Sequence, residues 1–144
     1  MAARRKLPPE PFETTIERVL DNGRGLASHE DRRLEVHDAL PGERVQARYL
    51  FGRRFRGQAQ AVAVLEPSAS RTEPRCPHFG TCSACVLQHM DAAAQLEFKQ
   101  SILLRQLNEA GLAPARVLAP LAADAWNYRR KARLSVRYVK KKER

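Results

Sequence analysis

Between residues 12 and 67, short runs of alternating apolar and polar side chains are separated by turn-forming sequences such as Asp-Asn-Gly and Leu-Pro-Gly. In the run 44–51, Val45, Ala47 and Tyr49 share one parity, and Arg44, Gln46 and Arg48 occupy the other. Such a strand buries one face and leaves the other in water. Strands are predicted at residues 12–20, 25–28, 33–37, 44–51 and 58–65. Five short strands at this spacing favour a small OB-like β-barrel.

A helix is predicted at residues 91–112, where apolar side chains recur at helical spacing. Asp91 is placed to cap its start, and Gly111 followed by Pro114 is placed to end it. The side chains expected to share its packing face are Ala92, Leu96, Leu103, Leu107 and Ala110. This composition indicates a packing role rather than a catalytic one.

Residues 126–139 alternate strictly enough to predict a further strand, whose apolar face consists of Ala132, Leu134, Val136 and Tyr138. The odd positions carry the cations Arg129, Lys131, Arg133 and Arg137. Because a merely solvated face rarely holds four cations and no acid, we interpret these side chains as phosphate contacts. The expected fold class is mainly β with some α: the barrel, a cysteine-rich metal loop, one helix and a strand of an incomplete second domain.

These elements divide the 144 residues into a lead at 1–11, a barrel domain at 12–67 and an incomplete domain at 68–144. The lead is expected to be disordered, since it lacks the apolar stretch of a signal peptide. No apolar run approaches the length of a membrane span, and the few clustered cysteines suit a reducing compartment. We therefore expect a cytoplasmic, monomeric protein with no membrane partner and one modest core.

The net charge of +10 is concentrated at the carboxyl end, where residues 129–144 carry nine basic side chains and one acidic. This distribution favours RNA as a partner at that end. A second candidate RNA contact is the loop Arg53, Arg54, Phe55 and Arg56. An aromatic ring among three guanidinium groups can stack on a base and hold phosphates, although a solvated hairpin tip is an equally acceptable interpretation.

All the cysteines, Cys76, Cys82 and Cys85, lie in one segment rich in small and turn-forming residues. This spacing lets several sulfur atoms converge on one metal. Zinc would take His89 as a fourth ligand and so complete a local Cys3His set. An iron–sulfur cluster would need a fourth thiolate from elsewhere. A disulfide with a spare thiol is disfavoured, since the cysteine count is odd and no export signal is present.

The segment 76–89 reads Cys-Pro-His-Phe-Gly-Thr-Cys-Ser-Ala-Cys-Val-Leu-Gln-His. It resembles the iron–sulfur segment of the bacterial 23S rRNA uridine-5-methyltransferases of the RlmD (RumA) type, which read Cys-Pro-His-Phe-x-x-Cys-Gly-Gly-Cys-x-x-Gln-His there. The resemblance implies that Cys76, Cys82 and Cys85 hold a 4Fe-4S cluster, with a fourth cysteine beyond residue 144. The replacement of Gly-Gly by Ser-Ala exchanges small residues and leaves these ligands unchanged.

Further segments resemble the same family in the same order. The sequences Asp-Asn-Gly-Arg-Gly at 21–25 and Ala-Leu-Pro-Gly-Glu at 39–43 are similar to parts of its TRAM domain, an RNA-binding β-barrel. Tyr-Arg-Arg-Lys-Ala-Arg at 128–133 is similar to the start of its central, RNA-contacting region. The resemblance covers about residues 12–139 and implies 23S rRNA as the partner.

In that family a catalytic cysteine adds to uracil C6, and S-adenosylmethionine supplies a methyl group to C5. All the cysteines here belong to the cluster motif, and no glycine-rich nucleotide loop follows a strand. The chain is therefore expected to be the RNA-binding, cluster-bearing amino-terminal part of such an enzyme. It is expected to be inactive alone and to contain no catalytic residue.

Two alternatives remain open. A self-contained Cys3His zinc module that binds RNA without enzymatic activity would use the same residues. Radical chemistry on S-adenosylmethionine also places three cysteines on one cluster and sometimes accompanies a TRAM domain. That chemistry expects three residues between the first two cysteines, where this chain has five.

Overall fold

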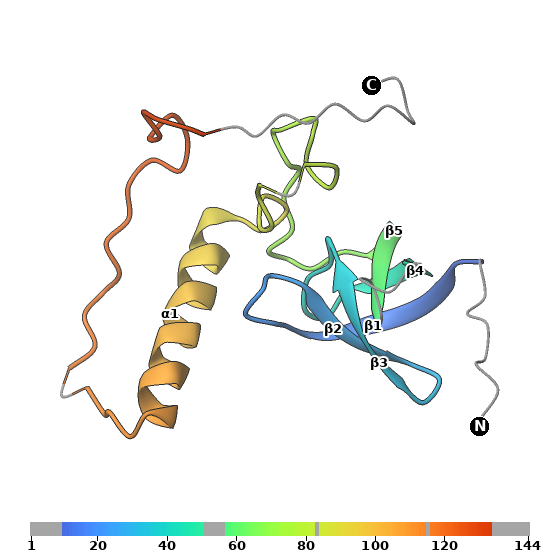
Figure 1. The fold of residues 1–144 in the computed structure, drawn as a ribbon, viewed down its shortest axis with the longest axis horizontal. Helices are drawn as coiled ribbons and strands as arrows, with labels where there is room; N and C mark the ends of the chain where they lie inside the picture. The colour runs from blue at the N-terminus through green and yellow to red at the C-terminus, as the bar shows by residue number, and fades with distance from the viewer. Residues whose placement is uncertain (1–9, 51–56, 83, 115, 134–144) are drawn as a thin grey trace.

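The computed structural model describes residues 10–50, 57–82, 84–114 and 116–133 (Figure 1). Its strands are β1 (Phe12–Val19), β2 (Gly25–His29), β3 (Arg32–His37), β4 (Arg44–Tyr49) and β5 (Gln58–Glu66). They close into a barrel in the order β1-β2-β3-β5-β4. Neighbouring strands are antiparallel except β3 and β5, which run parallel. The predicted five-stranded OB-like barrel is confirmed.

Alternation along the strands builds the barrel core. On β4, Val45, Ala47 and Tyr49 are buried, whereas Arg48 between them is exposed. Side chains from the other strands complete this cluster: Ile16, Ala27, Leu34, Val36 and Ala59, with Ala39 from the β3–β4 connection. Full burial of a side chain such as leucine or valine contributes roughly 1.5–3 kcal/mol. The barrel is therefore the stable body on which the other segments rest.

The helix α1 (Ala92–Glu109) begins at the predicted cap and ends three residues before the predicted end, with Gly111 closing it as expected. The Asp91 side chain accepts a hydrogen bond from the Ala94 amide at 2.9 Å. At the other end Gly111 adopts a φ of 73°, and the Leu112 amide donates to the Leu107 carbonyl at 2.8 Å. This is the Schellman arrangement, in which a left-handed residue closes a helix.

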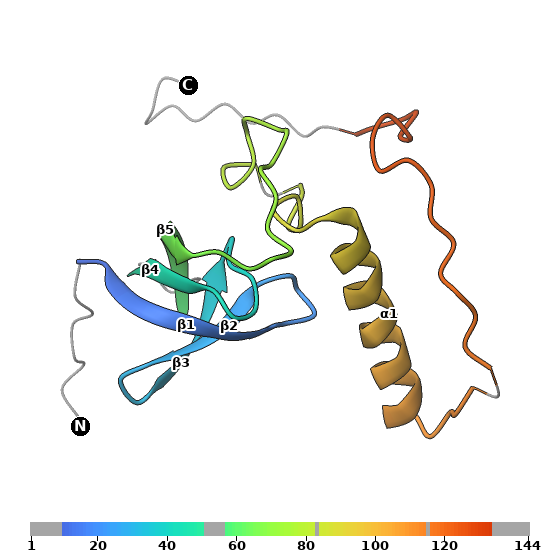
Figure 2. The ribbon, with the colours of Figure 1, turned by 180° about the vertical axis from the view of Figure 1, so that it is seen from behind.

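The predicted packing of α1 is wrong for this chain, because none of its side chains is buried and Leu103 is 55% exposed. Its apolar side chains instead line an open groove of about 410 Å³, whose opposite wall includes Pro114, Val117 and Leu118. Figures 1 and 2 show α1 beside the barrel, with residues 116–125 running along its outer side. Arg105 of α1 forms an ion pair with Asp21 of the β1–β2 turn.

The predicted carboxyl-terminal strand is also wrong over its described part. Residues 126–127 form a bend, and residues 128–133 have no regular structure. An alternating sequence becomes a strand only where a sheet edge can pair with it, and a closed barrel offers no free edge. The remaining residues of that prediction, including Arg137, lie outside the described residues. Within the described ranges, no helix is long and apolar enough to cross a membrane.

Candidate functional site

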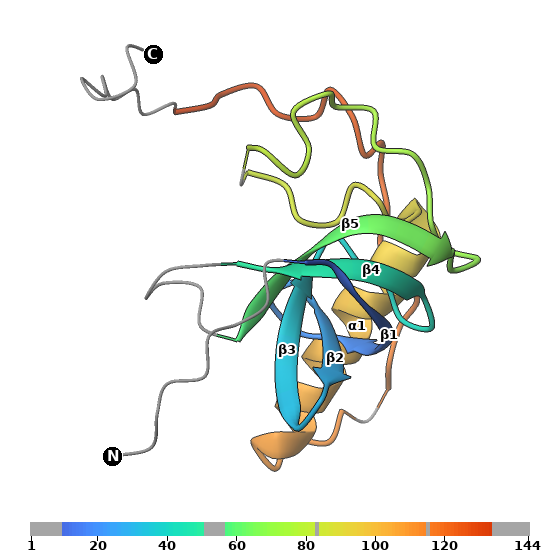
Figure 3. The same ribbon diagram turned by 90° about the vertical axis from the view of Figure 1, so that its right-hand side faces the viewer.

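The three cysteines lie on a loop formed by residues 71–90, here called the cysteine loop. Its two arms meet at an isolated bridge between Arg71 and Met90. The Thr72 amide donates to the His89 carbonyl at 3.0 Å, which closes the same end. Further along, the Cys76 amide donates to the Gln88 side-chain oxygen at 3.3 Å. Figure 3 shows the loop standing over the barrel beside β5.

All three cysteines are free thiols, and no disulfide bond joins any two of them. Cys76 is partly buried, and Cys82 and Cys85 are exposed. The turn between them is fixed by hydrogen bonds from the Phe79 amide to the Cys76 carbonyl and from the Cys82 amide to the His78 carbonyl. Among the described side chains, no three His, Cys, Asp or Glu residues converge as a metal-binding group. The loop thus supplies soft thiol donors without bringing them together.

His89 has no exposed surface, and neither ring nitrogen makes a hydrogen bond of normal geometry with a described residue, although the Ala39 carbonyl lies close enough to favour the protonated ring. Its ring lies 5.3 Å from that of Phe79, measured between centroids. Burial lowers the pKa of His89, and the positive charge of Arg71 lowers it further, against smaller opposite effects from Asp38, Glu43 and the backbone of Ala39. A neutral imidazole is the form that binds zinc. The Cys3His set is nevertheless not assembled, because His89 is enclosed while two of the thiols are exposed.

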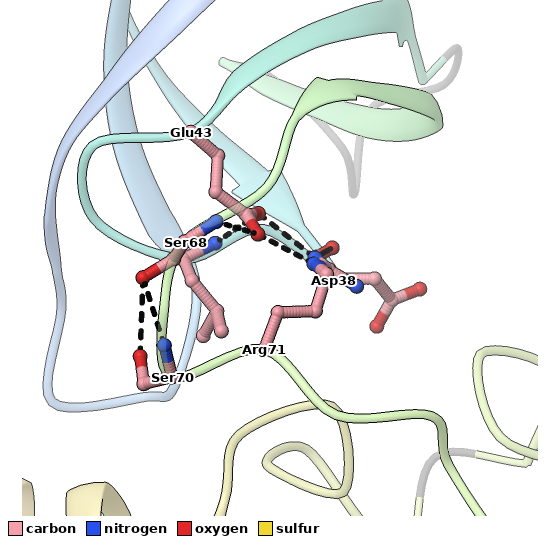
Figure 4. A network of polar contacts seen from close by, with 6 residues as sticks. Asp38, Glu43, Ser68, Ser70 and Arg71 are labelled. Atoms are coloured by element: carbon pink, nitrogen blue, oxygen red, sulfur yellow. Dashed lines mark hydrogen bonds and ion pairs between the residues drawn. The ribbon is translucent and has the colours of Figure 1, made fainter.

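A buried ion pair fixes the cysteine loop to the barrel (Figure 4). Glu43, in the β3–β4 connection, is 0% exposed, and Arg71 at the base of the loop is 21% exposed. Arg71 Nε and Nη2 donate to the two carboxylate oxygens, the second at 2.8 Å. Nη2 also donates to the Asp38 carbonyl at 2.8 Å. Two charge-assisted bonds in this fork geometry give a directional link between segments far apart in the sequence.

The Glu43 carboxylate is fully hydrogen-bonded. Besides Arg71, the backbone amides of Leu40 and Ser68 donate to it at 2.8 and 3.1 Å. Burial alone would raise the pKa of Glu43, but the hydrogen bonds from Arg71, Leu40 and Ser68 outweigh it and hold the pKa below its ordinary value. The carboxylate is therefore charged at neutral pH and organises the junction between barrel and loop.

Two glycines allow the loop and the barrel to approach closely. A Cβ atom on Gly23, in the β1–β2 turn, would lie 2.9 Å from a methyl carbon of Val86. A Cβ atom on Gly80, inside the cysteine loop, would lie 3.1 Å from an Asp38 carboxylate oxygen. Both glycines have positive φ, which other residues rarely adopt. The cysteine loop thus contacts the barrel at several separate points: the Glu43–Arg71 pair, the approach of Gly23 to Val86 and the approach of Gly80 to Asp38.

The predicted RNA contacts are only partly described. Arg53, Arg54, Phe55 and Arg56 lie outside the described residues, as does Arg137. Arg129, Lys131 and Arg133 are exposed, and so is Arg130 between them. Nothing in the residue pattern indicates that Glu43 and Arg71 pair. A pairing across so many residues is visible only once the barrel is closed.

The barrel and the loop define the class of the fold: a small OB-like barrel followed by a loop that carries three free cysteines. No protein-family model matches the chain. It is 51% identical over 140 residues to the 23S rRNA (uracil(1939)-C(5))-methyltransferase RlmD of Alkalilimnicola ehrlichii, covering 96% of this chain and 32% of that protein.

Two more relatives carry the same name. The RlmD of Stenotrophomonas maltophilia strain K279a is 43% identical over 146 residues, and that of Xylella fastidiosa is 44% identical over 148 residues. These matches cover 99% and 100% of this chain and 33% of each relative. Over almost its whole length the chain is therefore similar to RlmD-type methyltransferases, and the resemblance predicted from its motifs is confirmed. It spans about a third of the length of the curated relatives it matches.

Proposed function

We propose that this chain is the RNA-binding and 4Fe-4S-bearing amino-terminal part of an S-adenosylmethionine-dependent 23S rRNA uridine-5-methyltransferase. The observation that carries the proposal is the similarity over 96% of the chain to a protein named for that reaction. The closed barrel supports it, since OB-like barrels commonly bind nucleic acids. An rRNA substrate would be met in the bacterial cytoplasm, where the chain is expected to act as a monomer.

In this proposal the RNA contacts comprise the loop Arg53–Arg56 and the cations of the carboxyl-terminal segment. The exposure of Arg129, Lys131 and Arg133 supports the second set, because phosphate contacts need side chains that solvent can reach. The barrel would hold RNA in a defined position relative to the catalytic domain of the complete enzyme. Binding of S-adenosylmethionine and catalysis are assigned to that domain.

Cys76, Cys82 and Cys85 would hold the cluster. Three observations fit this role: the thiols are free, they share one loop, and that loop is anchored to the barrel by a buried ion pair. A 4Fe-4S cluster takes four thiolates, of which this chain supplies three. Such a cluster would tie the loop together and, through the loop, stiffen the surface beside the barrel.

Anaerobically purified protein is expected to be brown, with broad visible absorbance and with bound iron and sulfide. The cluster should be labile and the colour easily lost, because a ligand other than a cysteine of this chain would have to fill the fourth position. Elemental analysis together with the visible spectrum measures this. Cys82→Ser should abolish the colour, whereas Ser101→Ala, on the exposed side of α1, should leave it intact.

A colourless protein with one zinc per chain would instead support the Cys3His module. In that case His89→Ala should release the zinc, and His78→Ala should not, since His78 is an exposed histidine of the same loop. His89 is buried, so the barrel must first be shown to remain folded in that variant by circular dichroism.

The chain alone is expected to transfer no methyl group to 23S rRNA. Every thiol is assigned to the cluster, so none remains to attack uracil C6. Incubation with radiolabelled S-adenosylmethionine and unmodified rRNA checks this, with a full-length RlmD as the positive control. Formation of 5-methyluridine by the chain alone would mean that one of the three cysteines acts as the nucleophile.

A further inference from the structure

A groove of about 620 Å³ lies between the cysteine loop, the start of α1 and residues 125–129. Its walls carry two aromatic rings, Trp126 and Tyr128, and three cations, Arg75, Lys99 and Arg129. Cys85 also lines it. The rings and cations come from three separate parts of the chain, namely the cysteine loop, α1 and residues 125–129.

We propose that this groove binds a single-stranded RNA nucleotide, with the base stacked on Trp126 and the neighbouring phosphates held by Arg75, Lys99 and Arg129. The inference rests on the proposed RNA-binding function and specifies where an unpaired base is held. Single-stranded bases are recognised by stacking on aromatic or guanidinium planes, beside cations that follow the backbone.

Trp126 is placed to stack. The guanidinium carbon of Arg75 lies 5.2 Å from the centroid of its ring, a cation–π distance. The indole is nevertheless 41% exposed, so much of its surface remains available to a ligand. Arg129 lies over Tyr128 in the same way, at 5.7 Å. Planar side chains are thus already aligned at both positions, which lowers the entropy lost on binding a base.

One wall of the groove is fixed. The Gln95 side chain on α1 donates to the carbonyls of Leu87 and Met90 at 3.0 and 2.8 Å, joining the helix to the cysteine loop. Two carboxylates line the groove, and one of them, Asp91, caps α1. The charged side chains that remain in the lining are Glu73 and three cations, so the groove has a net positive charge. The exposed cations Arg130, Lys131 and Arg133 continue from Arg129, so a strand leaving the groove would meet further positive charge.

Trp126 is the only tryptophan of the chain, so its fluorescence reports this groove directly. A uridine- and adenine-containing oligoribonucleotide of about ten nucleotides should quench the emission in a saturable manner. Inorganic polyphosphate, which carries the charge without bases, should bind the cations without comparable quenching. An abasic oligomer of the same length, which has the backbone without the bases, should likewise bind without comparable quenching.

Trp126→Ala should weaken binding of the same RNA about tenfold, measured by anisotropy of a labelled oligonucleotide, because a base–aromatic stack is lost. Trp126→Phe should recover part of the affinity. The matched control is Leu121→Ala, another exposed apolar side chain nearby that does not line the groove. It should bind like the parent.

RNA that binds with full affinity to Trp126→Ala, or that leaves the tryptophan emission unchanged, would overturn the stacking site while leaving the proposed RNA-binding function in place. Quenching by polyphosphate equal to that by RNA would also overturn it, since the groove would then bind charge alone. Absence of any RNA binding by the parent chain would instead overturn the proposed function itself.

Discussion

Replacing Arg71 by methionine is expected to destabilise the folded chain by about 3 kcal/mol and to release the cysteine loop from the barrel. The Glu43 side chain has no exposed surface. Its carboxylate accepts four hydrogen bonds, and Arg71 donates two of them. A buried charge that loses its partner is far more costly than an exposed one. Urea unfolding measures the loss. Hydrogen exchange of the Asp91 amide, which is bonded to the Ser70 carbonyl across the base of the loop, reports the release.

The matched control is Arg44→Met. Arg44 also joins two carboxylates, Glu13 and Glu66, but on the exposed surface of the barrel. Its replacement should change stability much less, because exposed pairs are screened by water. Combining Glu43→Gln with Arg71→Met should recover part of the loss, since no buried charge would remain. Equal losses from Arg71→Met and Arg44→Met would show that the buried pair does not anchor the loop.

Acid provides a second check on the same ion pair. The pKa of Glu43 lies below its ordinary value of 4.5 in the folded chain, so the carboxylate stabilises the fold above that pH. This contribution should be lost as the pH falls through the lowered pKa. In Arg71→Met the lowering effects of the guanidinium are lost while burial and the two backbone amides remain, so the pKa of Glu43 should be higher than in the parent chain. The difference in stability between the parent chain and Arg71→Met should therefore become smaller on acidification, because protonation of Glu43 removes the charge that Arg71 compensates.

The parts of the fold that the sequence predicts are those specified by local chemistry. Val45, Ala47 and Tyr49 alternate with polar residues because β4 has one buried face, and this period identifies the strand without knowledge of its partners. Asp91 and Gly111 likewise end α1 through bonds to backbone groups only three to five residues away. These features can be recognised in a single sequence because the residues that interact lie within a few positions of each other along the chain.

The features that the sequence does not reveal depend on distant partners. The alternation at residues 126–133 has the period of a strand, but the described chain offers no sheet edge to pair with it. The apolar residues of α1 have the period of a packed helix, yet none is buried. The Glu43–Arg71 pair and the Arg75–Trp126 stack join segments that only the folded barrel and loop bring together. Their residue types are too common on protein surfaces to indicate these partners in advance.

Neutralising the carboxyl-terminal cations should reduce RNA affinity about a hundredfold at 0.1 M salt. Each phosphate contact to a single strand contributes about 0.7 to the slope of log affinity against log salt, because binding releases condensed counterions. Replacing Arg129, Arg130, Lys131 and Arg133 together by glutamine should therefore flatten that slope by about two to three units. Fluorescence anisotropy across a salt series measures the slope. The loss should be similar for oligonucleotides of different sequence, since phosphates carry no base identity.

Single replacements in this segment distinguish an irregular basic segment from an alternating strand. Because residues 128–133 have no regular structure and all four cations are exposed, Arg130→Gln should flatten the slope as much as Lys131→Gln does. Arg105→Gln is the control, since Arg105 is already paired with Asp21 and Glu109 and should release few counterions. This expectation would be contradicted if Arg130→Gln left the salt slope unchanged while replacement of Arg129, Lys131 or Arg133 flattened it strongly. It would show that the segment becomes a strand with one cationic face when RNA binds.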